Sequence, residues 1–412
     1  MQIHLSPEFQ GTRDGAEAEA IVRNCVHCGF CTATCPTYQL LGDELDGPRG
    51  RIYLIKQALE GEPVTSATQL HLDRCLTCRN CETTCPSGVQ YGQLVDIGRR
   101  VVDARVQRPW PERAVRWLLR EGLTSRWFGP ALRLGQAVRP LLPAPLRRKV
   151  PARSGRTGPL PVDRHARQVL LLAGCVQPAM APGIHGATVR VLDAAGIQSV
   201  VAPGAGCCGA IRAHLGDDAG GLDDMRRNID AWWPHVDRVE AIVMNASGCG
   251  VTVKDYGRAL AHDPAYAEKA RRISALTRDL SELLPDLVPK LKPRLGPLRQ
   301  AHLVFHPPCT LQHGQRLKGG VETHLRALGF RVDLPRDEAH LCCGSAGTYS
   351  VLHPDIAVQL RDRKLAHALA AGPQAIVSAN VGCITHLQSG TDLPVRHWVE
   401  VLDETLSRVS PL

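Results

Sequence analysis

The chain has 412 residues, of which 44% are hydrophobic and 4% aromatic, and 16 of them are cysteines. At about 150 residues per domain, this length indicates two or three domains with apolar cores, which excludes a disordered chain and a small disulfide-stapled domain. The net charge is +9, yet residues 98–167 alone hold 17 Arg/Lys and 4 Asp/Glu, so the positive charge is concentrated in one segment.

The first twenty residues contain neither the basic start nor the apolar core of a secretory signal. No apolar run reaches the roughly 18 residues of a membrane-spanning helix. We therefore expect a cytoplasmic protein without a transmembrane helix. Because disulfide frameworks belong mostly to secreted chains, the clustered cysteines favour metal binding.

Residues 1–97 contain two cysteine runs with the same spacing, C-x2-C-x2-C-x3-C-P, at 25–36 and 75–86. Between them, residues 49–62 place Ile52, Ile55, Ala58 and Leu59 at helical intervals. The sequence therefore predicts a mainly α-helical module that presents eight cysteines.

The spacing of these cysteines favours a pair of [4Fe–4S] clusters over zinc, which usually takes two separate C-x2-C knuckles. In two-cluster ferredoxins the fourth cysteine of each run ligates the other cluster. His27 is interpreted as a solvent or supporting residue. The two predicted ligand sets are Cys25, Cys28, Cys31 and Cys85 for the first cluster, and Cys35, Cys75, Cys78 and Cys81 for the second.

Residues 98–167 are predicted to form a basic connector. Two helical stretches, 111–122 and 125–139, precede a Pro-, Gly- and Arg-rich linker over 140–163. Tryptophans are interleaved with the arginines of the helical stretches. This pattern fits an anionic membrane surface, an acidic partner subunit or a strap between domains, and the sequence leaves the three open. No recognised nucleic-acid-binding module accompanies the charge, so we expect no nucleic-acid partner.

The rest of the chain repeats itself at an offset of 134 or 135 residues. In each copy, short apolar runs alternate with helix-like segments, which predicts an α/β unit with a mainly parallel sheet. A cysteine, a Cys-Cys-Gly and a Gly-Cys follow successive apolar runs, so they are expected beyond the carboxyl ends of strands. These thiols are Cys175, Cys207, Cys208 and Cys249 in the first copy, and Cys309, Cys342, Cys343 and Cys383 in the second.

This duplicated pattern resembles the cysteine-rich CCG domain of the heterodisulfide reductase family. The family's final C-x-x-C is incomplete here, because Ala246 and Asn380 stand at its first position. Four thiols per copy fit an ordinary iron–sulfur cluster, so we expect one or two further clusters, with zinc and unmetallated thiols as open alternatives. His185, His306 and His313 are interpreted as packing or surface residues, with metal ligation or proton transfer as the open alternative.

The predicted fold is multidomain: a mainly α-helical two-[4Fe–4S] ferredoxin module followed by two duplicated α/β CCG domains. The predicted divisions are a ferredoxin module at 1–97, the basic connector at 98–167, and the CCG domains at 168–298 and 299–412. This architecture, with the segments GDELDGPRGRIYLIKQALEG, GAGCCGA and LCCGSAGTYS, resembles the iron–sulfur subunits of bacterial glycolate oxidase.

The resemblance implies an electron-transfer subunit that works with FAD-binding partner subunits and has no catalytic residues of its own. Those partners oxidise glycolate to glyoxylate, and electrons leave towards membrane quinone, which implies a place on the cytoplasmic face of the inner membrane. By the same resemblance, FAD is expected on the partner only. Related CCG subunits serve D-lactate, glycerol-3-phosphate and heterodisulfide complexes, and a zinc-stabilised scaffold is a rival from another class.

Overall fold

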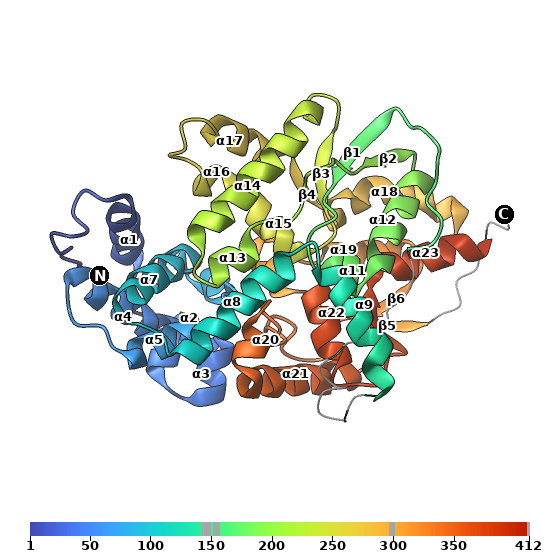
Figure 1. The fold of residues 1–412 in the computed structure, drawn as a ribbon. Coiled ribbons are helices and arrows are strands. Elements are labelled where there is room, and N and C mark those ends of the chain that lie inside the picture. Colours follow the sequence, from blue (N-terminus) through green and yellow to red (C-terminus); the bar gives the residue numbers. More distant parts are fainter. Residues whose placement is uncertain (142, 144–149, 151–156, 296–300, 410–412) are drawn as a thin grey trace.

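The computed structural model describes residues 1–141, 143, 150, 157–295 and 301–409. They form a helical module, a strap of two helices and two α/β units (Figure 1). Much of the predicted linker over 140–163, and the predicted boundary between 298 and 299, lie outside the described residues.

The helical module buries one face of its central helix, α4. That helix packs against α7, and its residues Ile52, Ile55, Ala58 and Leu59 are all buried, which confirms the helix predicted there. The helices of the module are α1 (Arg13–Asn24), α2 (Phe30–Ala33), α3 (Pro36–Leu41), α4 (Pro48–Glu60), α5 (Ser66–Asp73), α6 (Asn80–Thr84) and α7 (Tyr91–Arg105).

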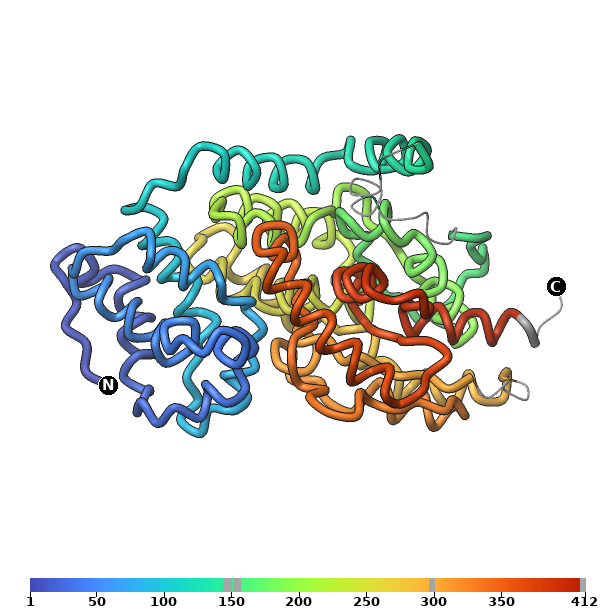
Figure 2. The backbone as a smooth tube through the Cα atoms, turned by 90° about the horizontal axis from the view of Figure 1, so that it is seen from below, coloured from blue at the N-terminus to red at the C-terminus, as the bar shows by residue number. Residues whose placement is uncertain are grey.

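Helices α8 (Trp110–Thr124) and α9 (Phe128–Val138) form the strap, which runs along one side of the molecule (Figure 2). Ion pairs attach α8 and the residues just before it to the helical module. Arg108 and Arg116 both pair with Asp73 of α5, at 2.5 and 3.2 Å. Because the charged side of α8 is paired inward, Trp110 and Trp117 face solvent.

Two four-stranded, fully parallel sheets follow, ordered β2-β1-β3-β4 and β6-β5-β7-β8. The first contains β1 (Arg167–Leu171), β2 (Ile197–Val200), β3 (Ala241–Met244) and β4 (Thr277–Asp279); the second contains β5 (His302–Phe305), β6 (Arg331–Asp333), β7 (Ala375–Ser378) and β8 (Val395–His397). The first three strands of each sheet are the apolar runs that the sequence predicts. The edge strands β4 and β8 were not predicted, because three residues with a charge among them give no apolar run.

Helices surround both sheets, and the second unit repeats the order of the first. The first unit has α11 (Gln177–Met180), α12 (Pro182–Ala194), α13 (Ala210–His214), α14 (Asp218–Trp232), α15 (Ser247–Lys254), α16 (Tyr256–Ala259), α17 (Ala267–Leu276) and α18 (Leu284–Leu291). The second has a π-helical turn (Thr310–Gly314), α19 (Gly320–Ala327), α20 (Tyr349–Leu352), α21 (Pro354–Leu369), α22 (Val381–Gln388) and α23 (Trp398–Val409).

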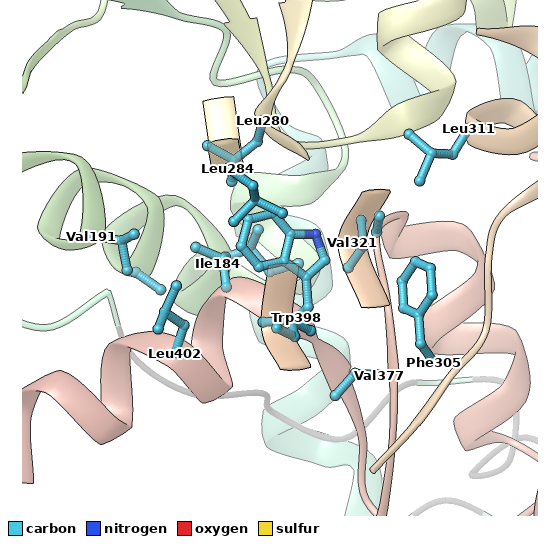
Figure 3. Packing of buried hydrophobic residues seen from close by; sticks show 14 of the residues in the cluster. Ile184, Val191, Leu280, Leu284, Phe305, Leu311, Val321, Val377, Trp398 and Leu402 are labelled. Carbon is cyan, nitrogen blue, oxygen red and sulfur yellow. The ribbon is translucent and has the colours of Figure 1, made fainter. Parts of the chain in front are cut away.

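The two α/β units exchange their last helices and share one core. Helix α18 follows the first sheet but packs on α19 of the second unit, and α23 follows the second sheet but packs on α12 of the first. Trp398 of α23 is fully buried in one apolar cluster with Ile184 and Val321, which come from different units (Figure 3). The duplicated units are therefore held in a fixed relation to each other.

The Asp73 anchor of the strap gives a first prediction. Asp73→Asn leaves two largely buried guanidinium groups without their shared carboxylate, so the free energy of unfolding should fall by up to about 3 kcal/mol. Urea denaturation measures this change. Asp223→Asn, which removes an exposed partner of Arg226, is the matched control and should change stability by less than about 0.5 kcal/mol.

The same anchor predicts a pH dependence. Burial alone would raise the pKa of Asp73, but the hydrogen bond from Arg108 and the charge of Arg116 outweigh it and lower the pKa below its usual 3.8. The carboxylate therefore contributes its full stability above pH 3.8, and this contribution disappears as the pH falls through the lowered pKa. A wild-type chain and an Asp73→Asn chain that lose stability in parallel over that acid range would contradict the assignment.

Candidate metal centres

The two cysteine runs of the helical module have the same backbone shape. His27 and Gly29 of the first run have positive φ angles of 60° and 83°, and Thr77 and Arg79 of the second have 53° and 58°. Such left-handed residues between the cysteines are uncommon outside glycine, so the same costly loop is built twice. His27 is exposed, in agreement with its interpretation as a solvent residue.

The first predicted set of thiols lies around one cavity. Cys25, Cys28, Cys31 and Cys85 all line it. Burial raises the pKa of Cys31 to about 11, and the charges of Cys25, Cys85 and Cys28 add to the effect. A cationic group between the four thiols would offset this effect on Cys31, which fits the chemistry of an iron–sulfur site.

The second predicted set is gathered in the same way. Burial raises the pKa of both Cys78 and Cys81, and the charges of Cys35 and Cys75 raise them further. The N–H of Thr77 donates to Cys75 Sγ at 3.4 Å. Cys85 therefore lies with the first run and Cys35 with the second, which is the crossed arrangement that the spacing predicts.

Two buried cations accompany the thiols, and the sequence reasoning missed both. Arg51 pairs with the buried Asp46 at 3.3 Å, and its charge acts on Cys75 and Cys35. Burial lowers the pKa of Lys364 to about 8, although the charges of the thiols nearby oppose this. Arg51 of α4 and Lys364 of α21 both lie among the buried apolar residues of their helices. A charged residue at such a position in the helical pattern is the sequence signal that would have identified them.

In the second α/β unit, four thiols meet at the carboxyl edge of the sheet. Cys309 Sγ donates to Cys342 Sγ over 3.8 Å, and the N–H of Gly344 donates to Cys342 Sγ at 3.4 Å. The thiols of Cys342 and Cys343 interact, as do those of Cys343 and Cys383. All four are buried. The predicted set is thus brought together.

The first unit repeats this arrangement with Cys175, Cys207, Cys208 and Cys249. A hydrogen bond to Cys207 and burial raise the pKa of Cys175. The N–H of Gly209 donates to Cys207 Sγ at 3.4 Å, as Gly344 does in the second unit. All sixteen cysteines of the chain are therefore gathered in four sets, and none forms a disulfide in the described structure.

The two positions that lack the expected cysteine, Ala246 and Asn380, directly precede helices α15 and α22. Asn380 donates from Nδ2 to Cys383 Sγ at 3.7 Å, whereas Ala246 offers no side-chain donor. The two CCG sites therefore differ in the polar groups around their thiols.

The second cysteine run lies against both α/β units. Cys78 packs against the buried cluster that contains Cys309 and Cys342. The charge of Cys309 adds to the effect of burial in raising the pKa of Cys78, and the charge of Cys78 contributes to the raised pKa of Cys342. Thr83 Oγ1 and His313 Nδ1 lie 2.8 Å apart, so His313 takes part in the contact rather than lying at the surface. On the other side, Arg79 pairs with Asp255 of the first unit at 3.3 Å.

Comparison with known proteins agrees with this geometry. A family model described as a 4Fe-4S dicluster domain matches residues 21–89, and one described as a cysteine-rich domain matches 169–254 and 303–388. The glycolate oxidase iron-sulfur subunit of Escherichia coli (strain K12) is 53% identical over 416 residues, which cover 99% of this chain and 100% of that protein. The chain belongs to the family of glycolate oxidase iron–sulfur subunits.

More distant relatives follow the same pattern. The probable glycolate oxidase iron-sulfur subunit of Bacillus subtilis (strain 168) is 29% identical and covers 94% of this chain and 92% of its own length. Lactate utilization protein A of Bacillus licheniformis is 27% identical, over 57% of this chain and 99% of its own length. As a glycolate oxidase iron–sulfur subunit, the chain is part of an oxidoreductase complex and carries iron–sulfur clusters. None of its described helices has the length and apolarity to cross a membrane.

Gly344 gives a prediction for the second CCG site. Its φ is +89°, and a Cβ there would lie 2.5 Å from the backbone oxygen of Ala357. Gly344→Ala should therefore displace the Cys342–Cys343 pair and lower the metal content of the purified chain. Gly347→Ala is the matched control, because it also has a positive φ, +65°, but has open space around it. Equal metal loss in both variants would show that backbone conformation alone is responsible.

Proposed function

We propose that the chain is the electron-transfer subunit of a flavin-dependent glycolate dehydrogenase complex. It carries electrons from the oxidation of glycolate to glyoxylate towards a membrane quinone. Two [4Fe–4S] clusters are held in the helical module by the two crossed thiol sets, and each CCG set holds a further cluster. Iron–sulfur clusters exchange single electrons, which a flavin that has taken a hydride can supply one at a time.

The observation that carries this proposal is that Cys78 packs against the buried cluster that contains Cys309 and Cys342. A scaffold would need no contact between separate thiol sets, whereas electron transfer needs neighbouring redox centres. Cys81 adds to the argument, because it belongs to the second set and also lines the cavity of the first. Three of the four sets are thus neighbours in succession, joined through the buried Cys81 and the partly buried Cys78.

The flavin and the substrate site are assigned to a partner flavoprotein. In the described part of the chain, the carboxyl edges of both sheets, where open α/β folds bind their ligands, are occupied by cysteines. Residues 204–209 have the G-x-G-x-x-G spacing after β2, but Cys207 and Cys208 occupy its variable positions and the helix that follows, α13, has only 5 residues. This loop therefore belongs to the first CCG thiol set and is not assigned to a dinucleotide. Glycolate is favoured over D-lactate because the glycolate oxidase subunit matches the whole chain and the lactate utilization protein only part of it.

Single thiols of each predicted cluster test the proposal. Cys28→Ser and Cys78→Ser, assembled with the flavoprotein partner, should lower acceptor-linked glycolate oxidation by an order of magnitude or more. Reduction of the partner's flavin by glycolate should persist, because that step precedes this subunit. Val26→Ser, an exposed change in the first run, is the control and should retain activity. Full acceptor-linked activity in both cysteine variants would refute the electron-transfer role.

The outer face of the strap is proposed to bind an anionic membrane surface on the cytoplasmic side. The acidic residues of α8, Glu112 and Glu121, pair with arginines of the chain. Arg113 and Trp117 lie on the exposed face, together with Trp110. Tryptophan and arginine on one helix face suit the interface of an anionic bilayer.

Vesicle binding tests this surface. The wild-type chain should sediment with phosphatidylglycerol-containing vesicles and not with phosphatidylcholine vesicles. Arg113→Gln should weaken binding by about fivefold, because one basic residue near such a surface contributes about 1 kcal/mol. Trp117→Ala should weaken it as well, whereas the control Trp233→Ala, a half-exposed tryptophan of the first α/β unit, should not. Equal binding to both kinds of vesicle, or binding to neither, would contradict this proposal.

A further inference from the structure

His306 is a buried histidine that directly follows strand β5 at the second CCG site. Its side chain is 1% exposed, and neither of its ring nitrogens has a hydrogen-bond partner among the described residues. A ring nitrogen and the Sγ atoms of Cys343 and Cys383 all lie within 4.8 Å of one another. The imidazole therefore points into the thiol set.

An imidazole in this position needs a partner. A buried polar group without one costs about 1–3 kcal/mol, and such groups are rare in native proteins. The hydroxyl of Ser378 bonds to the backbone oxygen of His306 and leaves the ring unsatisfied. The thiols of Cys343 and Cys383 lie beside the ring, and both are metal ligands in their ionised form.

The first CCG site shows what the fold requires at this position. The N–H of Leu172 donates to the oxygen of Val243 at 3.3 Å, and the N–H of His306 donates to that of Val377 at 2.8 Å. These bonds are equivalent in the duplicated sheets, so Leu172 is the counterpart of His306. Leu172 is also buried. The fold thus accepts an apolar residue here, and the second site alone carries the imidazole.

We propose that His306 is a metal ligand of the second CCG site, together with Cys343 and Cys383. Imidazole and thiolate together suit an iron of an iron–sulfur cluster and also zinc. The imidazole nitrogen of His306 would provide a ligand at the site where Asn380 stands in place of the family's cysteine. If the metal is iron, the neutral imidazole is a donor that the first site lacks, so the two CCG centres differ in their ligands.

This inference rests on the proposed function only in that the second CCG site binds metal. The test uses the full chain, purified without oxygen, as wild type, His306→Leu and His306→Cys. The leucine reproduces the residue of the first site, and the cysteine restores a soft ligand. His185→Leu is the control, because the Nδ1 of His185 is likewise buried and unpartnered but belongs to the first unit.

Iron, zinc and sulfide are counted per chain, and pulsed EPR of the reduced protein measures the coupling to a nitrogen nucleus. We expect His306→Leu to lose the metal of one centre and the strong nitrogen coupling, while the control retains both. His306→Cys should recover the metal without the coupling. Loss of zinc in place of iron also supports the ligand and identifies the metal, although it argues against the proposed electron carrier at this site.

Two results would overturn the inference. One is a His306→Leu chain that keeps all its metal and any nitrogen coupling present in the wild type. The other is a wild-type chain with no metal at the second CCG site, detected as an unchanged count after Cys343→Ser. The EPR signals of the clusters in the helical module serve as the internal check on folding, because Cys343 and His306 belong to neither predicted set there.

Discussion

Mutual repulsion among crowded, buried thiols is the constraint on which the rest of this structure depends. In the helical module, Cys31 and Cys78 lie where burial and neighbouring thiolates both oppose ionisation. In the α/β units, interactions with neighbouring thiols and burial likewise raise the pKa of Cys208 and of Cys343. Such thiols are stable as ionised ligands only when a cationic centre balances their charge. The left-handed residues between the cysteines and the buried Arg51 keep the thiols assembled, although both have a cost in free energy.

The arrangement of the domains follows from the need to keep thiol sets close to one another. The exchange of α18 and α23 joins the two α/β units through one core, so neither unit can move independently. The second cysteine run then lies between the two units. The side chain of Asn80 donates to the backbone oxygen of His340 in the second unit, and Arg79 donates to Asp255 of the first. A fixed separation between centres is what electron transfer requires, and it explains why a duplicated domain has been fused to a ferredoxin-like module.

Much of this was predictable from the sequence, because cysteine spacing and apolar runs are local signals. The crossed grouping of Cys35 and Cys85 follows from the two repeated runs, and the thiols at strand ends follow from the duplication. The exchanged helices, the contact of Cys78 with Cys309 and the position of His306 depend on packing between distant segments, which no local pattern encodes. The sequence favoured a packing or surface role for His306 and left metal ligation open, because proximity to Cys309 in the sequence does not show where the ring lies in the fold.

The most direct measurement is the iron and acid-labile sulfide content of the chain purified without oxygen. The account predicts about 8 of each from the helical module, and about 12 to 16 when the CCG sites are also filled. It further predicts that Cys28→Ser removes iron from the module but leaves the iron of the CCG sites. Little iron and sulfide with stoichiometric zinc would contradict the account and make the chain a zinc-stabilised scaffold for its partner subunits.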